Sequence, residues 1–260
     1  MTSIKGGAFA GCASLETIEV GEANAAYLSD SGILFNKDKT EIIIVPLGIK
    51  GDITISDGVT SIGDYEFYNR SSLTSVTIPD SVTSIGDWAF SECSSLTSIT
   101  IPDSVTSIGY DAFNQCFNLT NVNYLGTIDK WAEISFKHWQ SNPLFYAHKL
   151  CIDNELVTEI NITTATKITD YAFCKYEGLT GVTISDGVTS ISKRTFAGCM
   201  SLERIEVSET NSAYISDGGI LYNKDKTKII IVPLSIKGDI TISDGVTTCL
   251  LYTSPSPRDS

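Results

Sequence analysis

The chain has 260 residues, of which 42% are hydrophobic and 19% charged, and its net charge is −13. This composition supplies enough apolar side chains for a sizeable core. The acidity opposes binding to phosphate backbones and anionic lipids, so we expect no nucleic-acid partner. We also expect no membrane insertion, because the sequence lacks a run of about 18 apolar residues.

The chain opens without the apolar segment of a signal peptide, and a repeat pattern is already under way there. We therefore expect the natural protein to begin before Met1. The repeat is clearest where SVTSIGDWAFSECSSLTSITIPD (Ser81–Asp103) is followed directly by SVTSIGYDAFNQCFNLTNVNY (Ser104–Tyr124). One phenylalanine marks each repeat, at Phe9, Phe67, Phe90, Phe113, Phe173 and Phe196. Uninterrupted repeats are 23 residues apart, within the range of leucine-rich repeats.

Each repeat predicts two short strands separated by turns. Leu96 begins a segment in which Ile99 and Ile101 share the inner face and the residues between them face outward. Val82 and Ile85 bracket a second extended segment. One repeat cannot bury its own apolar side, but stacked repeats can, at about 4.8 Å per coil.

We place insertions at about residues 21–57, 125–162 and 208–244, and the first two lengthen the spacing between successive repeat Phe residues. The first and third contain GILFNKDKTEIIIVP (Gly32–Pro46) and GILYNKDKTKIIIVP (Gly219–Pro233), each predicting a β-hairpin. Residues 2–60 align without gaps to residues 189–247, with about 45 of 59 positions identical.

The middle insertion has a different pattern. Thr127 can cap a short helix with Ile128, Trp131 and Ile134 on one side. Leu150–Val157 predicts a tight hairpin that turns at Asp153-Asn154. This insertion is therefore predicted to be a small αβ module.

The unit VTSIGDxAFxxCxSLTSITIPDSV resembles the BspA-like (Treponema-type) leucine-rich repeat family across nearly all of residues 1–248. We predict a mainly β repeat solenoid, a right-handed superhelix with 23-residue coils, two β-hairpin modules and one αβ insertion. Residues 1–248 are expected to form a single domain truncated at both ends. The resemblance implies a non-enzymatic adhesin at the cell surface or outside the cell, with no shared catalytic residue and no cofactor.

Several residue types could suggest chemistry, but each has a simpler structural explanation. Cys12, Cys93, Cys116 and Cys199 all lie three residues after the repeat Phe, which favours packing in one inward column. A Cys93–Cys116 disulfide and a metal site remain less favoured alternatives. His148 and Cys151 would point to opposite faces of a strand, which opposes a nucleophile pair. The repeated aspartates, such as Asp80 and Asp103, suit turns without calcium.

The outward strand positions form the candidate partner-binding surface, because they are uncharged and regular on an acidic protein. We name the following residues the threonine face: Thr74, Ser75, Thr77, Thr97, Ser98, Thr100, Thr120, Asn121 and Asn123. Trp131 and Trp139 of the aromatic middle insertion are a second candidate. The expected partner is a protein on another cell or in matrix.

Two other functions remain possible from the sequence. The chain could be an architectural stalk that displays another domain. It could also be a β-helix-type enzyme that cleaves polysaccharides, but such an enzyme would need clustered carboxylates or basic residues on one sheet face. The middle strands instead carry Thr, Ser and Asn, which favours an interaction module.

The last twelve residues, CLLYTSPSPRDS (residues 249–260), break the repeat, because Ser254 stands where the next repeat Phe should fall. They resemble a translated transposase sequencing adapter, so we expect a non-native tail and a protein that continues beyond Thr248. The adapter hypothesis predicts that the nucleotides from Cys249 onward match the adapter and that the Thr248 codon ends in C. Sequencing the source DNA checks this, and different codons there would refute it.

Overall fold

The structure, a computed structural model, describes residues 4, 8, 9, 11–242 and 244–249. It contains two compact units, which are Met1–Leu125 with Phe136–Ala147, and Gly126–Ser135 with His148–Ser260. That residues 1–248 form one continuous domain stays a prediction.

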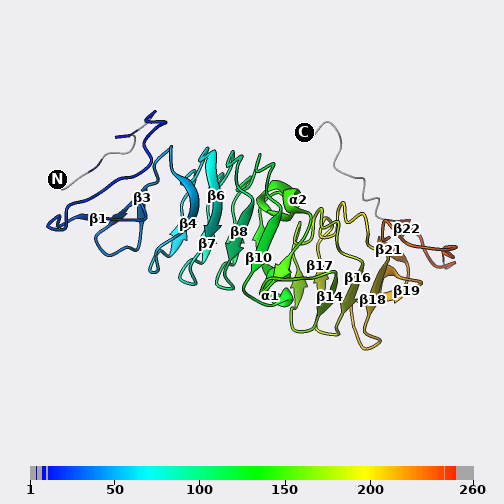
Figure 1. Ribbon diagram of the computed structural model, residues 1–260. Helices are drawn as coiled ribbons and strands as arrows, with labels where there is room; N and C mark the ends of the chain where they lie inside the picture. Colours follow the sequence, from blue (N-terminus) through cyan, green and yellow to red (C-terminus); the bar gives the residue numbers. More distant parts are fainter. Residues whose placement is uncertain (1–3, 5–7, 10, 243, 250–260) are drawn as a thin grey trace. The chain divides into compact units, whose positions relative to one another are not determined.

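Parallel strands stacked in register form the first unit (Figure 1). The longer strands are β4 (Lys50–Thr54), β6 (Ser72–Thr77), β8 (Ser98–Ile101) and β10 (Asn121–Tyr124). The register pairs Ser75 with Ser98 and Ser98 with Asn121, so that residues one repeat apart are neighbours. The predicted 23-residue coil is therefore confirmed.

A second row of short strands runs along the same coils. It contains β5 (Ser61–Ile62), β7 (Ser84–Ile85) and β9 (Ser107–Ile108), again paired in parallel. The repeat phenylalanines lie in the turns after these strands and are fully buried. The ring centroids of Phe67 and Phe90 are 5.0 Å apart, and those of Phe90 and Phe113 are 5.4 Å apart. Stacked rings thus fill the core of each coil.

The first inserted module is larger than the predicted hairpin. Strands β2 (Ile33–Asn36) and β3 (Ile42–Ile44) form the expected pair, but β1 (Tyr27–Asp30) adds a third antiparallel strand. The chain turns between β1 and β2 at Ser31 and Gly32, whose φ angles are 51° and 78°. Two positive φ angles in a two-residue loop suit the twist of a hairpin, which explains the additional strand.

Within the first unit, residues 136–147 imitate one more coil. The Lys137 N–H donates to the Ile108 carbonyl at 3.2 Å, as the Gly109 N–H donates to Ile85 one coil earlier. The segment contains a 3₁₀ turn, η1 (Trp139–Ser141), and the short helix α2 (Leu144–Ala147). We did not predict this degenerate coil from the sequence, because the segment carries neither the repeat Phe nor the repeat spacing.

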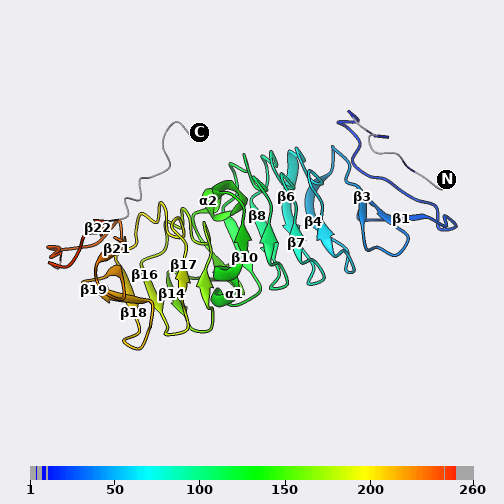
Figure 2. The same cartoon turned by 180° about the vertical axis from the view of Figure 1, so that it is seen from behind.

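The second unit repeats the parallel stack, with β14, β16 and β18 side by side in Figure 2. Its strands are β14 (Glu159–Ile162), β16 (Gly181–Ile184), β18 (Arg204–Val207), β15 (Lys167–Ile168) and β17 (Ser190–Ile191). A second three-stranded module contains β19 (Tyr214–Asp217), β20 (Ile220–Asn223) and β21 (Lys228–Ile231). The duplicated sequences therefore form duplicated structures.

Both predictions for the middle insertion that concern secondary structure are confirmed. Helix α1 (Ile128–Glu133) begins after Thr127, whose side chain accepts a hydrogen bond from the Lys130 N–H. Strands β12 (Cys151–Ile152) and β13 (Glu155–Leu156) pair across Asp153 and Asn154, which both have positive φ. Short strand β11 (Ser135–Phe136) follows the helix.

Most of the predicted adapter tail lies outside the described residues. Cys249, its first residue, belongs to β22 (Thr248–Cys249), which pairs in parallel with β21. The adapter origin of residues 249–260 stays a prediction.

Substitutions at the inward and outward positions of a coil should lower the free energy of unfolding by different amounts. Leu96 is fully buried and Thr97 is exposed. We expect Leu96→Ala to lower the free energy of unfolding by about 2–5 kcal/mol through cavity formation, and Thr97→Ala by less than about 1 kcal/mol. Chemical denaturation of the two variants checks this. Equal shifts of the midpoint would show that the two faces are assigned wrongly.

Candidate protein-binding surface

The threonine face lies on the outer side of β6, β8 and β10. Val76 and Ile99 pair across the strands and are buried, while their neighbours Thr77 and Thr100 pair on the opposite side and are partly exposed. This alternation follows from the two-residue period of a strand. The face is thus a set of matched rows in which Ser or Thr stacks on its own kind from β6 to β8, and Asn follows on β10 in two of the rows.

Hydrogen bonds between coils hold the first column of this face. The Thr97 hydroxyl donates to the Thr74 carbonyl at 3.0 Å, and the Thr120 hydroxyl donates to the Thr97 carbonyl at 3.3 Å. The Thr74 hydroxyl donates to Asp52 Oδ1 at 2.7 Å. These side chains are already ordered, so a partner that docks on them loses little side-chain entropy on binding.

Two residues of the predicted surface are buried. Asn123 is 4% exposed, although we expected it to face solvent. Its neighbours Val122 and Tyr124 are buried too, so β10 is covered on both faces at this point. Trp131 is 0% exposed, and its Nε1 donates to the Ala172 carbonyl at 2.7 Å. Trp131 therefore anchors α1 in the second unit and cannot contact a partner.

Trp139 stays partly exposed but lies away from the outer rows of β8 and β10. It belongs to η1, beside the turns that follow β9, and its Nε1 donates to Gln140 Oε1 at 3.1 Å. The Trp139 ring tilts against His138 with centroids 4.5 Å apart. The structure therefore does not unite Trp139 with the threonine face.

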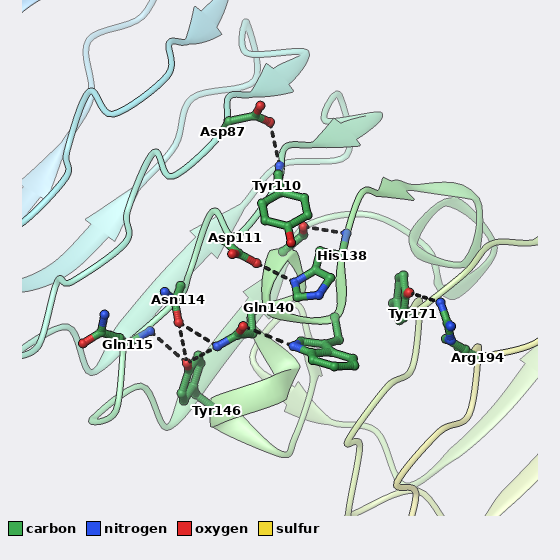
Figure 3. A network of polar contacts seen from close by, with 12 residues as sticks. Asp87, Tyr110, Asp111, Asn114, Gln115, His138, Gln140, Tyr146, Tyr171 and Arg194 are labelled. Atoms are coloured by element: carbon green, nitrogen blue, oxygen red, sulfur yellow. Dashed lines mark hydrogen bonds and ion pairs between the residues drawn. The ribbon is translucent and has the colours of Figure 1, made fainter. Parts of the chain in front are cut away.

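A ladder of aromatic rings lies along these turns, and sequence reasoning missed it. Tyr65 stacks on Trp88 at 5.1 Å, Trp88 tilts against Tyr110 at 5.4 Å, and Tyr110 stacks on His138 at 4.7 Å between centroids. The signal was present, because aromatic residues stand two or three places before the repeat Phe in three successive repeats. Coil stacking turns that pattern into continuous ring contacts, and Figure 3 draws the end of the ladder at Tyr110 and His138.

Polar contacts fasten residues 136–147 to the last regular coil of the first unit (Figure 3). His138 Nδ1 lies 2.5 Å from Asp111 Oδ1, and Gln140 Nε2 donates to Asn114 Oδ1 at 2.6 Å. The Gln115 N–H donates to the Tyr146 hydroxyl at 2.8 Å, at a place where earlier coils use a backbone carbonyl. Burial raises the pKa of Tyr146, which keeps the phenol neutral in this role.

The outer face of the second unit is charged, in contrast to the threonine face. Arg204 Nη2 lies 2.8 Å from Glu159 Oε1, and its Nε lies 3.4 Å from Glu206 Oε1. Gly181 lies between β14 and β18 and leaves room for the guanidinium, since a Cβ there would come 3.1 Å from Arg204 Cζ. A polysaccharide-cleaving site would need clustered carboxylates of this kind. Here the two carboxylates, Glu159 and Glu206, both pair with the Arg204 guanidinium.

Three members of the predicted cysteine column, Cys93, Cys116 and Cys199, are buried and have free thiols, whereas the prediction that Cys12 faces inward is wrong. Cys93 Sγ donates to the Phe67 carbonyl at 3.1 Å, and Cys116 and Cys199 make the same contact with the Phe of the preceding coil. Burial raises the pKa of Cys93 to about 12 and that of Cys116 well above its usual range. Cys12, at the first described coil, is exposed.

The described residues hold neither a metal cluster nor a helix that could span a membrane. No three of their His, Cys, Asp and Glu side chains gather as a metal ion would require. No helix among them has the length and apolar character needed to cross a bilayer.

These coils define the chain as a leucine-rich-repeat solenoid. It belongs to the BspA type leucine rich repeat family, whose six repeat copies match residues 50–144 and 146–244. No curated protein matches the chain.

Two solved structures resemble the fold. One is a leucine-rich repeat protein from Eubacterium ventriosum, with 23% identity, a TM-score of 0.52, and coverage of 87% of this chain and 60% of that one. The other is a leucine rich cell surface protein from Faecalibacterium prausnitzii, with 23% identity, a TM-score of 0.50, and coverage of 87% and 66%. The chain thus spans less than two thirds of either protein.

The burial of the cysteine column predicts selective labelling. In the native chain at pH 8, we expect iodoacetamide to react with Cys12, Cys249 and partly exposed Cys151, because only a thiolate attacks and burial holds the other four thiols neutral. Mass spectrometry after a short pulse counts the adducts. Rapid native labelling of Cys93 or Cys116 would contradict the buried column.

Proposed function

We propose that this chain is a non-catalytic protein-interaction module that binds a protein on another cell or in matrix through the threonine face. The observation that carries this proposal is an uncharged and internally hydrogen-bonded surface on a chain with a net charge of −13. Interface centres are poor in charged residues, so docking at this face requires little desolvation of charge.

The contacting set is reduced by the burial of Asn123 and Trp131. It consists of Thr74, Ser75, Thr77, Thr97, Ser98, Thr100, Thr120 and Asn121, with Trp139 as a separate candidate. The Faecalibacterium protein is described as a cell surface protein. We extend that location, at the cell surface or outside the cell, to this chain as part of the proposal.

Three lysines on the threonine face test this proposal. Thr77→Lys, Thr100→Lys and Asn121→Lys together should weaken binding at least about tenfold, or about 1.4 kcal/mol, because a partner would have to desolvate the added charges. The probes are fixed epithelial cells and reconstituted basement-membrane matrix, with fluorescently labelled full chain. The parent chain is expected to bind at least one of them saturably.

The chain offers a matched control at the residues that directly precede β5, β7 and β9. Thr60, Thr83 and Thr106 are exposed and stack in the same way, so replacing all three with lysine adds the same charge elsewhere. We expect this control to bind like the parent chain, and both variants to keep their unfolding midpoints. Equal binding by both variants would exclude the threonine face, and no saturable binding of the folded parent chain would favour the stalk.

A further inference from the structure

A groove of about 470 Å³ opens in the first unit, between the first inserted module and the coil of Phe67. Its lining combines the apolar segment that follows β3, including Val45 and Leu47, with Tyr65, Glu66 and Arg70. Phe9 also lines the groove. The groove thus brings an aromatic ring, a carboxylate and apolar side chains together.

The groove exists because one coil of the stack lacks its turn. The Arg70 guanidinium donates to the Val45 carbonyl, just as the Cys93 thiol one coil later donates to the Phe67 carbonyl. Val45 therefore has the same place relative to the coil of Phe67 that Phe67 has relative to the next coil. Its segment carries no SIGDxxF turn, and among the described residues no ring equivalent to Trp88 stacks on the outer side of Tyr65.

Tyr65 is consequently the open end of the aromatic ladder. One side of its ring stacks on Trp88 with an interplanar angle of 10°, while the side chain borders the groove and is 51% exposed. Tyr68 packs edge-on against the same ring with centroids 5.8 Å apart. The ring is thus held in place and has a face available for another planar group.

Glu66 is the unusual residue of the groove. The next two coils carry Ala89 and Ala112 at its position, and both are fully buried. Glu66 Oε2 accepts the Gly63 N–H at 2.6 Å, and burial raises the pKa of this carboxyl to about 7. A half-buried carboxylate gains more from a cationic partner than an exposed one does.

Arg70 attracts Glu66 through space, which lowers the pKa of this carboxyl, but burial has the larger effect. Its guanidinium donates to the carbonyls of Val45 and Tyr68 and is itself half-buried. No ion pair between Arg70 and Glu66 occurs among the described contacts. A cation from outside the chain would therefore complement the groove.

We propose that this groove binds an arginine side chain of a partner protein, with the guanidinium stacked on Tyr65 and paired with Glu66. The aliphatic part of the arginine would lie against Val45 and Leu47. Arginine fits better than lysine because its planar and weakly hydrated head can stack on a ring and pair with a carboxylate at once. This site is separate from the threonine face, so either can exist without the other.

The first experiment titrates the full chain with N-acetyl-L-arginine methylamide and follows the Gly63 and Glu66 amide signals by NMR. We expect a dissociation constant on the order of 1 mM at pH 8. The citrulline analogue, which has the same shape but no charge, should bind at least tenfold more weakly, and the lysine analogue should also bind more weakly. Equal binding of the arginine and citrulline analogues would overturn the proposal.

The second experiment compares Glu66→Ala with Glu92→Ala. Glu66→Ala installs the residue that the chain itself uses in the next two coils, so we expect it to fold with an unchanged or higher unfolding midpoint. It should lose the preference for arginine over citrulline. Glu92 accepts a hydrogen bond from Tyr68 outside the groove and serves as the matched control. Retained arginine preference in folded Glu66→Ala would refute the site.

The pH dependence gives a further readout. Besides Glu66, the charged groups around the groove, within the part of the chain that the structure describes, are Glu41, Asp64 and Arg70. Because Glu66 is protonated below about pH 7, arginine affinity should rise between pH 6 and pH 8 as its carboxylate forms. Glu66→Ala should abolish this rise. If arginine affinity rises equally with pH in the parent chain and in Glu66→Ala, another group causes the rise and Glu66 does not belong to the site.

Discussion

Parallel stacking in a 23-residue register is the constraint on which the rest of this structure depends. The Phe67 N–H donates to the Ala89 carbonyl, and the Phe90 N–H donates to the Ala112 carbonyl, both at 2.8 Å. Each coil thereby satisfies its neighbour's backbone groups while the repeat Phe rings stack between them. Because every residue lies beside its equivalent one coil away, any residue type that recurs becomes a continuous column.

Insertions interrupt this stacking, and single side chains repair the interruptions. Where the preceding coil is regular, the third residue after the Phe is a small cysteine that reaches a carbonyl. Where an inserted module precedes, this position carries Arg70 or Tyr176, which reach the carbonyls of Val45 and Leu150. Tyr146 has the corresponding role at the end of the first unit's regular coils, with its hydroxyl in place of a backbone acceptor. The residue type in this column therefore reflects the architecture of the preceding coil.

The two proposed surfaces have opposite physical origins. The threonine face arises from regularity, because identical polar residues stack in rows and bond to one another. The arginine groove arises from a missing turn, which leaves the Tyr65 ring and the Glu66 carboxylate without the neighbours that later coils have. Regular rows offer area to a protein partner, and the groove offers a place for one anchoring side chain.

The sequence by itself determined the coil length, the inward and outward positions, the duplicated modules and the capped helix at Thr127, because all of these follow from local periodicity and turn chemistry. The tertiary structure alone decided which outward residues keep solvent contact. Asn123 and Trp131 became buried, and Tyr65 gained an open face, because burial depends on which segment an insertion places beside a coil. Spacing along the chain fixes a residue's own coil position, but it cannot reveal a neighbour that arrives from an irregular segment.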